Sequence, residues 1–206
     1  MKNFFNTDGF LWRWFSKIGS FFGLSLLWML CCVPVITSIP ACIALYDSVA
    51  HCVRGDEEHA FRHFFRTLKK ELLRGLGLSL LWGVLGFILF YGYSILYQVG
   101  KESQIASIYS LVYLGSMLIP LGILAWLIPV ESRFSHSFIS LHKTAATFAL
   151  AHLPTTAAIL GILAVSIVLT LLVPVLLMLM PAITVTIQCW LIEKVFKKYM
   201  PEEDAE

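Results

Sequence analysis

Four long stretches without a charged residue constrain this chain more than any other feature of its sequence. They cover residues 18–46, 75–100, 103–130 and 144–192. A helix crosses the hydrocarbon core of a bilayer in about 20 residues, so each stretch is long enough to span it. Only 14% of the residues are charged, against about 25% in soluble domains. The sequence therefore predicts a polytopic membrane protein and excludes a soluble enzyme, a secreted disulfide scaffold and a disordered chain.

The placement of the basic residues predicts how the chain is threaded. They cluster before residue 18, between 54 and 74, at 133 and 143, and after 193, whereas Lys101 stands beside Glu102. The positive-inside bias then places the rich clusters and both termini in the cytoplasm, with Lys101 on the outer side of the cell membrane. We expect an all-α transmembrane helical bundle of five to six membrane segments, forming a single domain over 1–206 with cytoplasmic amphipathic helices.

The expected segments follow from the apolar runs and from two prolines. Pro34 and Pro40 each remove a backbone donor and obstruct a continuous helix, so 18–53 is expected to be a hairpin broken between them. Whether its second arm, 40–53, crosses fully is left open. The other expected segments are a cytoplasmic amphipathic helix at 55–74 and membrane spans at 76–99, 105–130, 155–173 and 175–193.

Asp47 is the one acidic residue well inside a predicted membrane arm, which makes it a candidate functional group. In one interpretation it lies at the inner interface and pairs with Arg54. In the other it lines a polar cavity at the proline break, into which freed carbonyls and hydroxyls also point. The residues assigned to that cavity are Pro34, Thr37, Ser38, Pro40, Tyr46 and Asp47. Glu131 and Arg133 are expected to form an interfacial pair at the end of a span.

The segment 55–74 has the pattern of an amphipathic helix. Asp56 is a plausible N-cap, and phenylalanines and leucines recur at helical spacing opposite a row of lysines and arginines. The simpler interpretation is an anchor in the headgroup plane, and the alternative is a coupling helix that a cytoplasmic partner grips. The residues assigned to the coupling helix are Arg54, Phe61, Phe64, Phe65, Arg66, Lys69 and Lys70.

No motif for catalysis or cofactor binding is present in the sequence, so we expect neither an enzyme nor a bound cofactor. His59 and His63 are four residues apart, with His51 and Cys52 nearby, but the HExxH pattern is absent. We therefore expect ordinary interfacial histidines and no metal site. The five cysteines lack a CxxC spacing and predict neither a zinc site nor a disulfide framework.

One motif resembles a known family. Leu27-Trp28-Met29-Leu30-Cys31-Cys32-Val33-Pro34-Val35-Ile36-Thr37, then Pro40-Ala41, Ala44-Leu45-Tyr46, Val53-Arg54-Gly55-Asp56-Glu57 and Phe64-Phe65-Arg66, are similar to the YesL-like family of uncharacterised bacterial membrane proteins. The resemblance implies a link to carbohydrate uptake, because members are often encoded beside carbohydrate ABC transporters and sugar-responsive regulators.

Two functions remain open at this stage. The first is a transport-associated protein, either an accessory or a permease-like component of carbohydrate uptake. The second is a non-transporting interaction scaffold for a sensor or an assembly partner. The expected partners are the lipid bilayer and ABC transporter or sensor subunits, and not nucleic acid. A water-accessible cavity reaching Asp47 and Thr37 would favour transport, and dense apolar packing around the break would favour a scaffold.

Overall fold

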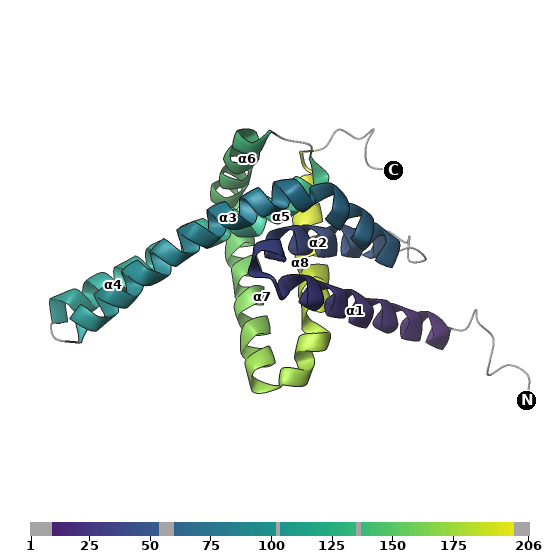
Figure 1. Ribbon diagram of the computed structural model, residues 1–206, viewed down its shortest axis with the longest axis horizontal. Helices are drawn as coiled ribbons and strands as arrows, with labels where there is room; N and C mark the ends of the chain where they lie inside the picture. Colours follow the sequence, from purple (N-terminus) through teal and green to yellow (C-terminus); the bar gives the residue numbers. More distant parts are fainter. Residues whose placement is uncertain (1–9, 54–59, 102–103, 135–136, 200–206) are drawn as a thin grey trace, which may run out of the picture.

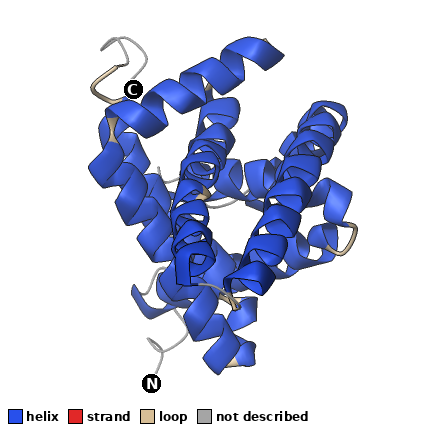
Figure 2. Cartoon of the chain, turned by 90° about the vertical axis from the view of Figure 1, so that its left-hand side faces the viewer, coloured by secondary structure: helices blue, strands red, loops and turns tan. Residues whose placement is uncertain are grey.

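The computed structural model describes residues 10–53, 60–101, 104–134 and 137–199, and every regular element in these ranges is a helix (Figures 1 and 2). This confirms the all-α class. The elements are α1 (Phe10–Cys32), η1 (Val35–Thr37), α2 (Ser38–Val53), α3 (Ala60–Gly100), α4 (Gln104–Ser116), α5 (Leu118–Arg133), α6 (Phe138–Ala151), α7 (Leu153–Leu172), η3 (Pro174–Met178) and α8 (Met180–Phe196).

Three helices in the described residues are long and apolar enough to cross a membrane. They are Ala60–Gly100, Ser107–Arg133 and Leu153–Leu172, and they contain or overlap three of the expected spans. Two shorter apolar helices, Gly19–Cys32 and Val35–His51, form the arms of the proline-broken segment. These helices indicate a membrane protein, while the count of five to six crossings and the orientation of the termini stay predictions.

The fourth expected span, 175–193, has a different form in the structure. Its first residues form the 3-10 helix η3, and α8 begins only at Met180 and has 17 residues. Pro174 and Pro181 each lack the N–H group that a continuing helix would need, which places the turn between α7 and α8 here. The two helices lie side by side in Figure 1, and residue contacts join them.

The helix α3 unites two segments that the sequence analysis separated. Its 41 residues correspond to a length of about 62 Å and include both the amphipathic stretch and the expected span. Its first turns pack on α2, and its second half leaves the bundle with α4 as a projecting arm (Figure 1). Side chains of the arm, among them Phe87, Phe90 and Leu111, are 67–70% exposed, as expected of lipid-facing residues.

The core is organised around α2, which contacts α1, α3, α5 and α8. One buried cluster joins α2 to α5, α6 and α8 and includes Tyr46, Trp126 and Phe196. The other joins α2 to α1 and the start of α3 and includes Leu24 and Phe64. Because both clusters share α2, this short helix connects the two parts of the bundle.

The burial of Phe64 alters the expected role of the amphipathic stripe. Phe64 is fully buried, whereas Phe61 and Phe65 remain 43% and 54% exposed. Part of the apolar stripe thus packs on protein, and the helix is held by α1 and α2 in addition to any contact with lipid.

Candidate functional site

The proline break is stabilised by hydrogen bonds from its own neighbours. The Thr37 hydroxyl lies within hydrogen-bonding distance of the carbonyl oxygens of Cys31 and Pro34, the second at 2.8 Å. The backbone N–H of Ile39 donates to Ser79 Oγ of α3 at 3.2 Å. Groups that a regular helix would have paired internally therefore find partners, which lowers the cost of a break inside an apolar segment.

The start of α2 also lies unusually close to α3. Pro40 is buried, and a Cβ atom on Gly75 would stand 2.6 Å from Pro40 Cβ and 2.9 Å from Pro40 Cδ. Only glycine at position 75 allows this approach without displacement. Ser38, the neighbouring candidate residue, is half-buried at the first position of α2.

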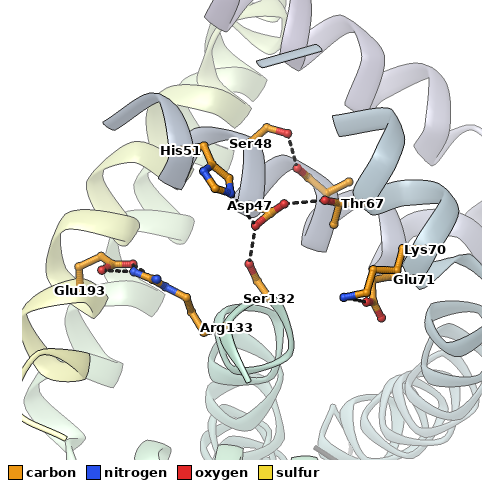
Figure 3. A network of polar contacts seen from close by, with 10 residues as sticks. Asp47, Ser48, His51, Thr67, Lys70, Glu71, Ser132, Arg133 and Glu193 are labelled. Atoms are coloured by element: carbon orange, nitrogen blue, oxygen red, sulfur yellow. Dashed lines mark hydrogen bonds and ion pairs between the residues drawn. The ribbon is translucent and has the colours of Figure 1, made fainter. Parts of the chain in front are cut away.

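Asp47 lies at the centre of a polar contact between three helices, which we call the Asp47 junction (Asp47, His51, His63, Thr67 and Ser132). Thr67 of α3 donates to Asp47 Oδ2 at 2.5 Å, and Ser132 of α5 donates to Oδ1 at 3.4 Å (Figure 3). His51, one turn along α2, has its Nε2 3.8 Å from Oδ1. The ring of His63 stacks on that of His51 with centroids 4.3 Å apart.

Glu131 and Arg133 do not pair with each other, contrary to expectation. Arg133 Nε donates to Glu193 Oε1 of α8 at 3.1 Å, and Arg74 Nε of α3 lies 2.9 Å from Glu131 Oε1. Residues two apart on a helix point about 200° from each other, so an i, i+2 pair cannot face. The two ion pairs instead join α5 to α8 and to α3.

A cavity of about 310 Å³ lies between α2, α5, α7, η3 and α8, with Trp28 of α1 in its wall. Its lining is mainly apolar, and its polar groups include Tyr46, Gln188 and the hydrogen-bonded hydroxyls of Ser166 and Thr184. The Tyr46 hydroxyl and Gln188 Nε2 have no hydrogen-bond partner within the described part of the chain. Small apolar or amphiphilic molecules suit such a lining.

The six residues assigned to one polar cavity do not share one surrounding in the structure. Tyr46 lines the cavity, Thr37 closes the proline break, and Asp47 belongs to the junction. Neither Thr37 nor Asp47 is among the residues that line the cavity. Pro40 packs on Gly75, and Pro34 is exposed. The structure therefore gathers only part of the predicted set around any one space.

Most of the residues assigned to the coupling helix are exposed on the first turns of α3, but Phe64 is buried there and Arg54 lies outside the described residues. We call Arg62, Phe65, Arg66 and Lys69 the basic face. All four side chains are exposed, and with His63 they line a shallow groove. Lys70 is also exposed and pairs with Glu71 at 3.2 Å.

Sequence reasoning missed the contacts that hold Asp47. One signal was available, because Asp47 and His51 are four residues apart and so share a helix face. The contributions of Thr67 and Ser132 depend on how α3 and α5 pack on α2, which no periodicity in the sequence reports.

Comparison with known proteins adds a family match over part of the chain. No curated protein and no solved structure matches it. Residues 21–93 match a family model described as "Protein of unknown function, DUF624". The matched segment contains the proline break, Asp47, Thr67 and the basic face, while the YesL-like label stays an interpretation. Over residues 21–93 this membrane-type helical chain is thus similar to proteins of the DUF624 family.

Proposed function

We propose that this chain is a membrane interaction protein that holds an acidic surface of a partner protein on its basic face. The observation that carries the proposal is the way in which the start of α3 is fixed. Phe64 is fully buried against α1 and α2, while the basic face on the same helix turns remains exposed. A binding surface held on a packed helix loses little conformational freedom when a partner binds.

The composition of the basic face suits a protein partner. Arg62, Arg66 and Lys69 follow one another at i+4 and i+3, so their charges lie along one side of the helix. Phe65, 54% exposed, stands among them. Arginine and aromatic side chains are enriched where binding energy concentrates in interfaces, and the surrounding charges accelerate association with an acidic surface.

Because α3 is continuous, it connects such an interface directly to the predicted membrane segment. The helix runs without interruption from the basic face to the apolar arm at Gly100. A partner bound at the first turns of α3 therefore acts on a rigid element whose second half lies in the predicted membrane. This arrangement is useful to a scaffold that aligns a membrane partner with a cytoplasmic one.

Association with carbohydrate uptake is the second candidate function, in an accessory form. The resemblance to the YesL-like family supports transporter or sensor subunits as the partner class at the basic face. The mainly apolar lining of the cavity gives less support to a permease-like role in sugar transport, because sugars are recognised through many hydrogen bonds.

Site-specific photo-crosslinking in living cells tests the proposal. A photoreactive residue at position 65 is expected to give a protein adduct, and one at position 139 is not. Ile139 is 69% exposed but belongs to another helix, α6. The triple variant Arg62→Glu, Arg66→Glu, Lys69→Glu is expected to abolish the adduct at 65.

A matched charge reversal serves as the control. Three exposed basic residues lie elsewhere in the chain, namely Lys143, Lys197 and Lys198. Changing all three to glutamate is expected to leave the adduct intact. Adducts with lipid alone at position 65 would refute the proposal and assign the basic face to membrane anchoring. A protein adduct that survives the charge reversal of the basic face would also refute it.

A further inference from the structure

We propose that Asp47, His51 and His63 bind one divalent transition-metal ion, a site that does not depend on the proposed interaction function. Each of the three residues offers one ligand atom, and these atoms lie within 4.8 Å of one another. All three side chains are half-buried, so a bound ion would be partly shielded from water while remaining within reach of it.

The spacing of the ligand atoms is close to that of an occupied site. With metal–ligand bonds of 2.0–2.1 Å, ligand atoms of a tetrahedral site stand about 3.4 Å apart. Asp47 Oδ1 and His51 Nε2 are 3.8 Å apart, and no pair in the set exceeds 4.8 Å. Rotation of the side chains that moves each ligand atom by about 1 Å therefore closes the site, and the helices need not move.

The carboxylate already has the outer hydrogen bonds typical of a metal ligand. Thr67 donates to Oδ2 at 2.5 Å, while Oδ1 is directed towards His51, whose Nε2 lies 3.8 Å away (Figure 3). Ser132 donates to Oδ1 from a third helix at 3.4 Å. Such outer contacts orient ligands and account for about 10–100-fold of metal affinity.

The donor set selects the class of ion. Two imidazoles and one carboxylate suit Zn²⁺, Fe²⁺, Co²⁺ and Ni²⁺, whereas Mg²⁺ and Ca²⁺ prefer oxygen ligands. Three protein ligands leave at least one coordination position for water. The two imidazole rings stack with centroids 4.3 Å apart and an interplanar angle of 29°, so the rings lie next to each other, and each must turn about its side-chain bonds for a ring nitrogen to point at a shared ion.

The position of the site suggests what the ion would do. His51 lies near the end of α2 and His63 in the first turns of α3, next to Arg62 of the basic face. A metal bridge would fix the angle between these helices and hold the basic face against the bundle. Its role is structural in this proposal, and no reaction is assigned to it.

Metal titration of the full chain in detergent, purified without a histidine tag, tests the proposal. Zn²⁺ is expected to bind with one equivalent per chain, measured by competition with a chromophoric chelator, and to raise the unfolding temperature. Co²⁺ is expected to give visible d–d absorption without the thiolate charge-transfer bands that a cysteine site would produce.

Variants distinguish this site from other ways of binding Zn²⁺. Asp47→Asn, His51→Gln and His63→Gln are each expected to weaken Zn²⁺ binding at least about 100-fold, and Thr67→Val about 10-fold. His142→Gln removes a histidine whose ring nitrogens contact Trp82 and Phe138, and it is expected to leave affinity unchanged. His59→Gln, outside the described residues, is also expected to have no effect.

Several results would overturn the proposal. They are the absence of a stoichiometric Zn²⁺ site, equal binding by wild type and His63→Gln, and loss of binding in His59→Gln with retention in His51→Gln. The last would place the ion on a local pair of histidines four residues apart. If Asp47→Asn does not fold, the two histidine variants decide the outcome, because they leave the Thr67–Asp47 hydrogen bond intact.

Discussion

The close approach of α2 to α3 at Gly75 can be tested with one methyl group. In Gly75→Ala the new Cβ would stand 2.6 Å from Pro40 Cβ and 2.9 Å from Pro40 Cδ. The atoms that it meets belong to a rigid ring, which cannot turn aside as the end of a flexible side chain can. The helices must therefore separate, and the hydrogen bond from Ile39 N–H to Ser79 Oγ lengthens with them.

Gly77→Ala provides a matched control in the same helix. A Cβ at position 77 would have no atom within 4 Å. Both substitutions exchange glycine for alanine in a helix, which favours the helix by up to about 1 kcal/mol. The difference in unfolding free energy between the two variants therefore reports the steric cost, about 1–3 kcal/mol for overpacking a rigid contact.

The assay is reversible unfolding in mixed detergent micelles, titrated with SDS and followed by circular dichroism. Gly75→Ala is expected to unfold at a lower SDS concentration than Gly77→Ala, because its unfolding free energy is lower by about 1–3 kcal/mol. Adding Pro40→Gly to Gly75→Ala removes the clashing ring, so the double-mutant cycle should show a favourable coupling of about 1 kcal/mol or more. Equal stability of the two alanine variants, within about 0.5 kcal/mol, would refute the contact.

Two further predictions concern the core and the topology. Thr156→Val keeps the side-chain shape but leaves Trp126 Nε1 and the Ala149 carbonyl without their 2.9 Å partners. This substitution should lower the unfolding free energy by about 1–3 kcal/mol in the same assay, and a decrease below about 0.5 kcal/mol would contradict the two hydrogen bonds of Thr156. In a background without native cysteines, Lys101→Cys is expected to react with an impermeant reagent in intact cells, and Lys70→Cys only after permeabilisation. Labelling of position 70 from outside would contradict the predicted orientation.

Apolar periodicity and proline placement were sufficient to predict the helical class and the positions of the main apolar segments. Both signals are local, because they depend on the length of a bilayer crossing and on a missing backbone N–H group. The break at Pro34–Pro40 is an example, since α1 ends at Cys32 and α2 begins at Ser38. The sequence analysis gave 55–74 and 76–99 as separate segments, whereas α3 joins 60–74 to the following span in one helix. The change from amphipathic to uniformly apolar sequence marks a change of surroundings and not the end of a helix.

The contacts of charged side chains were the least predictable part. Glu131 and Arg133 are two residues apart at the end of an apolar segment, yet their partners, Arg74 and Glu193, lie about 60 residues away on other helices. A helical wheel shows which side a residue faces but not which helix comes to lie there. Asp47 illustrates the same limit, because its hydrogen-bond donors, Thr67 and Ser132, come from two neighbouring helices.

The histidines show how this limit changes a functional interpretation. Spacing within one helix directs attention to His59 and His63, but spacing alone does not identify the residue that would supply a third ligand. Packing of α3 on α2 instead brings His63 onto His51, which already shares a face with Asp47. A three-ligand set then exists at the helix–helix contact, and its formation requires the two helices to be docked. Metal binding and the docking of α3 are therefore thermodynamically linked, so an ion that binds only the docked form must stabilise the basic face against the bundle.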